Sequence, residues 1–204
     1  MDPELVRADF DRIARALGDC DPPDEGAVPT LAAGDDVLDV GCGTGVFAAR
    51  IAPHVRRVVA IDLSPEMLAR ARARGLPNVE LHEGDFLTWR DARTFDAVVS
   101  VAALHHMPFE AGLSALAARV RPAGLLFIRD LFASRGLLYN ALSFVLRPRR
   151  RTHPELAAAW RQHGVHERHL PFAEIRRRAR AVLPAAAVHR HLGWRYTLVW
   201  RRPA

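Results

Sequence analysis

The 204-residue chain is predicted to have an α/β fold, in which helices cover both faces of a doubly wound, mostly parallel sheet. Three observations support this prediction. Short apolar runs alternate with segments of helical character, a glycine-rich turn follows the first run, and 50% of the residues are hydrophobic. A chain of this length and composition can bury a substantial core. We therefore expect residues 1–204 to form one domain.

Residues 1–35 are expected to form an N-terminal helix and a loop. The helix has an apolar face that can pack on the body of the protein, made of Phe10, Ile13, Ala14 and Leu17. Asp21-Pro-Pro-Asp-Glu-Gly26 has the composition of a loop. The start of the chain is acidic where a signal peptide would be basic, and two cysteines, Cys20 and Cys42, give no disulfide framework. These features predict a cytoplasmic protein.

The segment Val37-Leu-Asp-Val-Gly-Cys-Gly-Thr-Gly45 joins a short apolar strand to a glycine turn, and a helix is expected from Val46. Glycines at alternate positions let the backbone take positive φ angles and approach a ligand closely. A phosphate-binding P-loop needs a lysine after its last glycine, and this chain contains no lysine. The dinucleotide fingerprint needs glycine where Val46 stands. The turn therefore favours a nucleoside cofactor other than NAD.

Four further apolar runs predict the remaining strands of a core over residues 36–130. They are Val58–Ile61, Val79–His82, Phe95–Ser100 and Leu125–Ile128, and a turn at Arg121-Pro-Ala-Gly124 leads into the last of them. Asp62 ends the second strand about 20 residues beyond the glycines, the interval at which an acidic residue meets ribose hydroxyls. Taken alone, Asp62 would belong to a turn in which Ser64 caps a helix that begins at Pro65.

The C-terminal third is expected to contain three helices and a pair of strands. The helices cover Leu137–Leu146, Pro154–His163 and Phe172–Val182, and the strands cover Ala187–His191 and Tyr196–Trp200. The first helix has an apolar stripe, formed by Leu137, Leu138, Ala141, Leu142 and Val145. Arg147-Pro-Arg-Arg-Arg151 follows it directly. The stripe can pack on the sheet, or residues 137–151 can form a basic amphipathic segment that contacts a membrane peripherally.

The formal net charge of +6 is unevenly distributed along the chain. Residues 1–130 carry 14 Arg and 20 Asp or Glu, a net charge of −6, whereas residues 131–204 carry 15 Arg and 3 Glu, a net charge of +12. The basic character is therefore wholly C-terminal. Such a charge can attract an anionic substrate, an anionic membrane surface or RNA.

The segment Asp39-x-Gly41-x-Gly43-x-Gly45 resembles motif I of the class I S-adenosylmethionine-dependent methyltransferases, of the small-molecule type in the methyltransferase-domain family. The motifs around Asp62, Asp85 and Val101 follow at matching intervals, so the resemblance spans roughly residues 36–130. It implies a Rossmann-like, seven-stranded sheet, mostly parallel with an antiparallel C-terminal strand, in a three-layer αβα sandwich. It also implies S-adenosylmethionine as cofactor and S-adenosylhomocysteine (SAH) as product.

The resemblance assigns roles to the site residues. Asp62 would meet the ribose, Asp85 the adenine amino group, and Phe86 would wall the base. The methionyl carboxylate would lie near the helix after Gly45, where free N–H groups favour an anion. Phe10 would reach the cofactor from an N-terminal lid helix. The expected cofactor-binding residues are Phe10, Asp39, Gly41, Cys42, Gly43, Gly45, Asp62, Leu63, Met67, Asp85, Phe86, Ser100 and Val101. Cys42 would serve through its backbone, not as a nucleophile.

On the acceptor side, His105 and His106 are the candidate catalytic residues, because imidazole accepts a proton near neutral pH. The pair can equally shape the pocket, and it lacks the partner cluster that a metal site needs, so no metal is expected. Residues 131–185 would form variable acceptor-side helices, with Leu137–Leu146 lining a hydrophobic substrate site, and residues 186–204 the C-terminal strand pair. The reaction implied is an SN2 methyl transfer to an O, N, S or C atom of a small, apolar or aromatic molecule.

Two other functions stay open. One is an rRNA or tRNA methyltransferase that uses the Arg-rich C-terminal third, and the other is a non-catalytic methyltransferase-like binding module. The motif of enzymes that methylate exocyclic amines, Asn/Asp-Pro-Pro-aromatic, is replaced by Ser100-Val-Ala-Ala103, and the cysteine of pyrimidine C5 methyltransferases is missing from the same region. Those two nucleic-acid activities are therefore disfavoured. The oligomeric state is not predicted.

Overall fold

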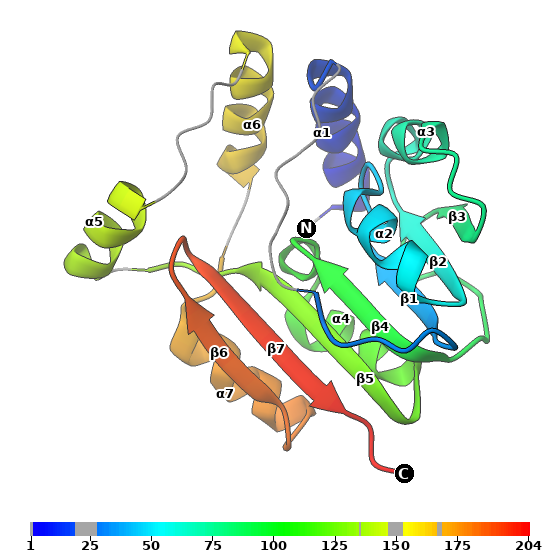
Figure 1. The fold of residues 1–204 in the computed structure, drawn as a ribbon. Helices are drawn as coiled ribbons and strands as arrows, with labels where there is room; N and C mark the ends of the chain where they lie inside the picture. The colour runs from blue at the N-terminus through cyan, green and yellow to red at the C-terminus, as the bar shows by residue number, and fades with distance from the viewer. Residues whose placement is uncertain (1, 19–27, 135, 147–152, 167–168) are drawn as a thin grey trace.

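A computed structural model describes residues 2–18, 28–134, 136–146, 153–166 and 169–204 (Figure 1). Its centre is a seven-stranded sheet in the order β3-β2-β1-β4-β5-β7-β6. The strands are β1 (Asp36–Val40), β2 (Arg57–Asp62), β3 (Val79–Glu83), β4 (Phe95–Val101), β5 (Val120–Leu131), β6 (Ala187–His191) and β7 (Arg195–Arg201). Neighbours from β3 to β5 pair in parallel, and β7 is antiparallel to both β5 and β6. The predicted fold class is confirmed.

Helices cover both faces of this sheet, and others stand beyond the carboxyl ends of its strands (Figure 1). They are α1 (Pro3–Ala16), α2 (Val46–Ile51), α3 (Pro65–Ala73), α4 (Phe109–Ala118), α5 (Leu137–Leu146), α6 (Pro154–His166) and α7 (Phe172–Val182), with short 3-10 helices η1 (Ala52–His54) and η2 (Leu104–His106). Helix α6 extends beyond the predicted end at His163. The predicted loop Asp21–Gly26, Cys20 and Arg147–Arg151 lie outside the described residues. Among the described helices, none is long and apolar enough to cross a membrane.

The alternation of side chains along each strand produces two separate cores. Successive strand residues point to opposite faces of a sheet, so Leu38 joins the core beneath α4 and α7, whereas its neighbour Val37 packs with α2 on the other face. All five residues of β1 are buried, as expected for a central parallel strand covered on both sides. This burial fixes the position of the glycine turn that follows β1.

The predicted turn at Arg121–Gly124 is part of β5 instead. Phe95 pairs with Val120 and Ala97 pairs with Leu125, so four residues of β5 bulge opposite Asp96. Ala123 has a φ of 61°, and its N–H donates to the Arg202 carbonyl, while the Arg202 N–H donates to the Gly124 carbonyl. The backbone of Arg202 therefore forms hydrogen bonds with the bulge and holds it in the sheet.

The apolar stripe of α5 does not pack on the sheet, so that alternative is wrong. Leu137 and Leu138 are 88% and 84% exposed, and Val145 is 76% exposed. Ser143, which is polar, is the buried residue of this helix. The physical reason is that the polar side chains of α5 find hydrogen-bond partners on the protein, so they form its inner face.

We expect Gly41→Ala to destabilise the protein by roughly 2–4 kcal/mol. Gly41 has a φ of 73°, and an added Cβ would lie 2.3 Å from the Ala103 Cβ. Gly43→Ala is the control, because Gly43 also has a positive φ, of 53°, but its added Cβ would meet nothing within 4 Å. Only left-handed strain of about 1–2 kcal/mol is expected there. Urea unfolding followed by circular dichroism measures both losses, and equal losses would show that Ala103 does not constrain the turn.

Candidate functional site

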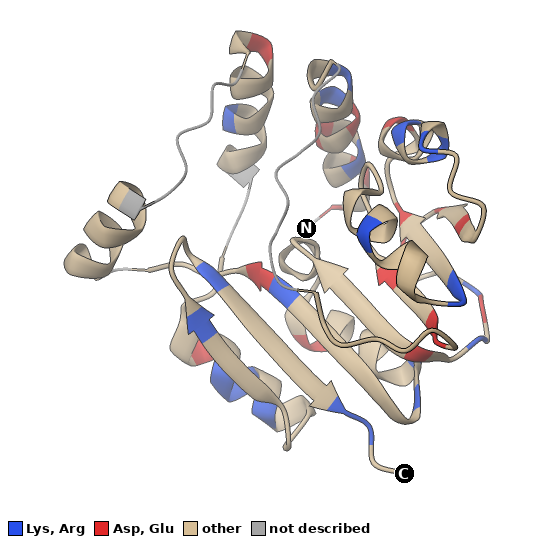
Figure 2. Ribbon diagram, in the orientation of Figure 1, with Lys and Arg blue, Asp and Glu red and all other residues tan. Residues whose placement is uncertain are grey.

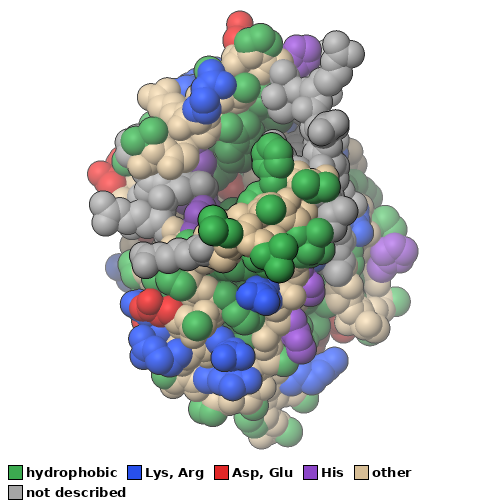
Figure 3. All heavy atoms as spheres, turned by 90° about the vertical axis from the view of Figure 1, so that its left-hand side faces the viewer, with side chains coloured by type: hydrophobic (Ala, Val, Ile, Leu, Met, Phe, Trp, Pro, Cys, Tyr) green, Lys and Arg blue, Asp and Glu red, His purple; other side chains and the backbone are tan. Residues whose placement is uncertain are grey.

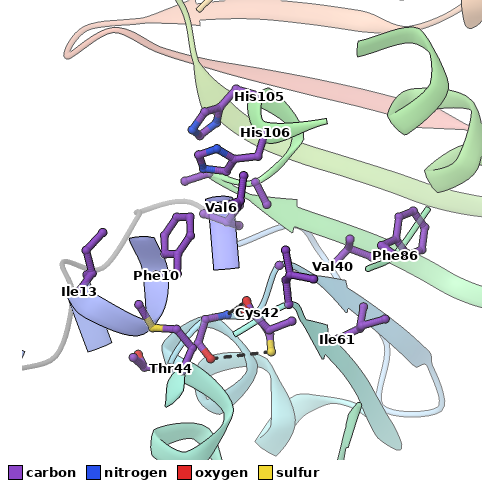
Figure 4. A pocket seen from close by; sticks show the side chains of 18 of the residues that line it. Val6, Phe10, Ile13, Val40, Cys42, Thr44, Ile61, Phe86, His105 and His106 are labelled. Atoms are coloured by element: carbon purple, nitrogen blue, oxygen red, sulfur yellow. Dashed lines mark hydrogen bonds between the residues drawn. The ribbon is translucent and has the colours of Figure 1, made fainter. Parts of the chain in front are cut away.

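A cavity of about 740 Å³ opens where the parallel strands end. The strand order reverses between β1 and β4, and open α/β sheets bind ligands at the carboxyl ends of their strands beside such a switch point. The cavity is lined by the glycine turn, by the ends of β1, β2 and β4, by η2, and by side chains of α1 and α6. In Figure 4, Phe86 lies at one end of this cavity and His105 and His106 at the other, with Phe10 reaching in from α1.

The carboxylate of Asp62 holds the glycine turn against the start of α3. Its Oδ2 accepts the Gly43 N–H at 2.7 Å, and its Oδ1 accepts the Ser64 N–H at 2.9 Å. The Ser64 hydroxyl caps α3 by accepting the Met67 N–H at 3.1 Å. Both predicted roles of this segment are therefore compatible, because each carboxylate oxygen keeps a further acceptor position for a ligand. Burial raises the pKa of Asp62, against the effect of these N–H donors.

Among the buried polar atoms of the cavity lining, some have no hydrogen-bond partner in the part of the chain that the structure describes. They include Oδ2 of Asp39 and Oγ1 of Thr44. Burial, and then the charge of Asp62, raise the pKa of Asp39 to about 7. Because a buried polar group without a partner is costly, these atoms indicate a ligand with a cationic group for Asp39 and polar groups for Thr44. An amino-acid moiety has both.

Cys42 lines the cavity as a buried thiol, not as a thiolate. It is 7% exposed, and burial followed by the charges of Asp62 and Asp39 raises its pKa well above the ordinary range. The thiolate is the nucleophilic form. The structural interpretation of Cys42 therefore agrees with its surroundings.

Asp85 and Phe86 form the far end of the cavity. The Leu87 N–H donates to Oδ1 of Asp85 at 3.0 Å, which fixes the loop after β3. Phe86 is 5% exposed and belongs to the core beneath α4. Both residues nevertheless line the cavity, as do the predicted Leu63, Met67 and Val101.

Gly45 and Ser100, which were expected to contact the cofactor, are not among the residues that line the cavity. Gly45 packs against α3, where an added Cβ would lie 3.0 Å from the Ala71 Cβ. Ser100 is fully buried, and its hydroxyl donates to the Val40 carbonyl at 3.1 Å. These two residues support the turn and join β4 to β1.

His105 forms a buried pair with Asp130, a residue that sequence reasoning missed. The His105 Nδ1 lies 2.5 Å from Oδ1 of Asp130, and the His105 backbone N–H donates to Oδ2 at 2.9 Å. Burial alone would raise the pKa of Asp130, but the charge of His105 and its hydrogen bonds outweigh burial and leave the pKa lowered. A carboxylate at Nδ1 fixes the ring orientation and leaves Nε2 as the proton acceptor of the neutral ring. The sequence signal that could have identified Asp130 is its position as an acidic residue at the end of the fifth predicted strand.

Aromatic and imidazole rings from α1 and α6 surround His106. The Phe10 ring centroid lies 5.2 Å from that of His106 and 4.9 Å from that of His163. His163 on α6 also contacts Asp9 on α1, with Nδ1 and Oδ2 separated by 3.2 Å, and both side chains are 1% exposed. The predicted α1 lid is therefore joined to α6, which the sequence pattern did not indicate. Among the described residues, no group of three His, Cys, Asp or Glu side chains could hold a metal ion.

Comparisons of the sequence agree with this geometry. Residues 37–124 match a family model described as a methyltransferase domain. An uncharacterized methyltransferase of Mycobacterium tuberculosis is 34% identical over 180 residues, which cover 82% of this chain and 87% of the relative. A ubiquinone biosynthesis O-methyltransferase of Xanthomonas oryzae pv. oryzae is 35% identical over 105 residues, covering 48% of this chain and 44% of that protein.

Solved structures show the same fold. DhpI in complex with SAH is 27% identical, covers 83% of this chain and 78% of its own, and gives a TM-score of 0.60. The [4+2]-cyclase SpnF covers 99% of this chain and 97% of its own with a TM-score of 0.70. Its identity is only 16%, so this second likeness shows the fold alone.

Asp39→Asn is expected to stabilise the ligand-free protein more at pH 8 than at pH 5. The folded-state pKa of Asp39, about 7, lies above the ordinary value of 3.8, so the folded protein holds a proton that the unfolded chain releases. The stability that this group contributes is complete below about pH 4 and is lost as the pH rises to 7. At pH 8 the charge therefore costs roughly 1–4 kcal/mol, which asparagine avoids. Urea unfolding at both pH values tests this, and an equal gain at both would contradict the raised pKa.

Proposed function

Because the chain belongs to the methyltransferase-domain family of class I S-adenosylmethionine-dependent methyltransferases, we propose that it methylates a small molecule inside this cavity. The observation that carries the proposal is the continuity of the cavity. It extends from the buried acids beside the glycine turn to His105, which pairs with Asp130, so a cofactor at one end and an acceptor at the other would share one enclosure. A volume of about 740 Å³ is within the range of cofactor and ligand sites.

The cofactor end is matched to the parts of S-adenosylmethionine. Asp39 would pair with the ammonium group, and the Thr44 hydroxyl would donate to the carboxylate. Asp62 would accept from the ribose hydroxyls, and Asp85 with Phe86 would bind the adenine. The atoms of Asp39 and Thr44 that lack partners in the described residues support this assignment, because the amino-acid part of the cofactor would satisfy both.

Apolar side chains form a large part of the acceptor end, beside His105, His106, His163 and Arg195. Val6 and Phe10 from α1, Leu131 at the end of β5, and Leu156 and Trp160 from α6 line it. This lining supports a small, apolar or aromatic acceptor. Two relatives are consistent with an acceptor of low molecular mass. One is a ubiquinone biosynthesis O-methyltransferase, and the other is DhpI, which has been solved in a complex with S-adenosylmethionine (SAM) and a ligand abbreviated HEP.

His105 would accept the proton of the acceptor at Nε2, while Asp130 holds Nδ1. When bound, S-adenosylmethionine supplies a methyl group on a positively charged sulfur, which leaves with the bonding electron pair as a neutral thioether. The acceptor lone pair forms the new bond, so little covalent help from the protein is needed. The protein would mainly align the reactants, by holding the nucleophile about 3–3.5 Å from the methyl carbon. Helices α1 and α6 would keep water out.

We expect Asp39→Asn to weaken the binding of SAH by about 10- to 100-fold, because it removes a charged partner of the ammonium group. The affinity for 5′-methylthioadenosine, which lacks the amino and carboxyl groups, should stay within about twofold. This ligand has no ammonium group, so the substitution removes none of its hydrogen bonds. Isothermal titration calorimetry measures both affinities. Equal losses for the two ligands would mean that Asp39 acts only by supporting the fold.

Asp130→Asn should lower kcat by roughly 10²- to 10⁴-fold once an acceptor is known, the usual contribution of general acid–base catalysis. The acceptor can be found by following label from S-adenosyl-[methyl-³H]methionine into phenols, carboxylic acids, amines and thiols. The acidic limb of the kcat profile should also move to lower pH, because the imidazolium of His105 loses its anionic partner. Affinity for SAH is the control and should not change. An unaltered kcat and pH profile would exclude proton transfer through this pair.

A further inference from the structure

Helix α5 presents its apolar side to solvent. Leu137, Leu138, Leu142 and Val145, named here the α5 patch, are 88%, 84%, 45% and 76% exposed. None of these four residues lines the cavity. Figure 3 shows hydrophobic side chains gathered over this helix. Single exposed apolar residues are normal, but a contiguous apolar surface of this kind marks an interaction site.

The orientation of α5 is fixed by its polar side. The Tyr139 hydroxyl donates to the His191 carbonyl at 2.6 Å and accepts the Trp194 N–H at 3.0 Å. The Trp194 indole N–H donates to Oδ1 of Asn140 at 3.0 Å, and the Gly193 N–H donates to the Ser143 hydroxyl at 3.2 Å. Three polar side chains of α5 thus bind the turn between β6 and β7. Turning the patch inward to close the cavity would break these hydrogen bonds.

Arginines lie beside the inner side of α5 and on α7. The Arg190 guanidinium lies 5.2 Å from the ring centroid of Tyr139 on α5 and 5.9 Å from that of Phe172, and Arg176 lies 6.0 Å from the same Phe172 ring. Further basic residues follow α7 and the C-terminal strands (Figure 2). Residues 131–204 carry 15 Arg and 3 Glu. The segment of sequence that contains the patch is therefore strongly basic.

We propose that the α5 patch docks the protein on a lipid surface with anionic head groups. Apolar side chains that enter the acyl boundary, beside arginines that meet head groups, are the combination that binds peripheral helices to such membranes. A second copy of the chain would bring an equally basic face, which repels it. RNA offers the matching charge, but aliphatic leucine and valine side chains give its bases no stacking partners. Helix α5 lies on the side of the sheet where α1 and α6 cover the cavity (Figure 1), so docking would hold the cavity near the bilayer.

Co-sedimentation of the full chain with vesicles tests this proposal. Binding is expected to vesicles of phosphatidylcholine with added phosphatidylglycerol, to decrease with salt, and to be much weaker with phosphatidylcholine alone. The double variant Leu137→Ser/Leu138→Ser should lose roughly tenfold or more in partition coefficient. Val145→Ser should lose about threefold. Its matched control is Val165→Ser on α6, where the valine is 79% exposed against 76% for Val145, and this variant should bind as the wild type does.

Four outcomes would overturn the proposal. The first is that the wild type does not bind anionic vesicles, and the second is that Val145→Ser and Val165→Ser lose equally in partition coefficient. The third is that the wild type forms a dimer in sedimentation velocity and does not bind vesicles, and that the double variant abolishes the dimer. Salt-sensitive retention of transfer RNA that the leucine substitutions leave unchanged would likewise assign the basic face to nucleic acid. Circular dichroism verifies the fold of each variant. SAH affinity should be unchanged throughout, so failure here leaves the methyltransferase assignment intact.

Discussion

The carboxylate of Asp62 joins the two segments that form the floor of the cavity. By accepting the N–H groups of Gly43 and Ser64, it fixes the turn after β1 relative to the helix after β2. Burial, and then the charge of Asp62, raise the pKa of Asp39 and of the Cys42 thiol. The site thus holds acidic groups that the ligand-free protein does not fully satisfy. Such groups reduce stability and are retained where a ligand compensates for them.

The sequence could predict the parts of the structure that follow from local pattern. Apolar runs predicted the strands, and the spacing of Gly41 and Gly43 predicted the turn. The position of Asp62 at a strand end predicted that it lies beside this turn. Contacts between distant segments left no such pattern. Asp130 meets His105 from another strand, and Asp9 meets His163 across 154 positions of sequence. The hydrogen bond from the Ser100 hydroxyl to the Val40 carbonyl likewise joins two strands and left no local pattern in the sequence.

Helix α5 illustrates why an apolar stripe does not define an inner face. The periodicity of Leu137–Leu146 correctly gave a helix, but burial was decided by Tyr139, Asn140 and Ser143, whose partners lie on a turn about 50 residues away. The two parts of the chain differ in net charge and in proposed role. The acidic first two thirds, with a net charge of −6, contain the proposed cofactor-binding residues. The basic remainder, with a net charge of +12, carries an exposed apolar helix and part of the acceptor enclosure.

The central claim is that one cavity positions the cofactor sulfur between the glycine turn and the His105–Asp130 pair. A crystal structure of the protein with SAH measures this directly. The account predicts the amino-acid moiety beside Asp39 and Thr44, the ribose on Asp62, the adenine against Phe86, and the sulfur facing His105 and His106. A reversed ligand, with adenine at the histidines, or a sulfur atom directed away from the acceptor end, would contradict it.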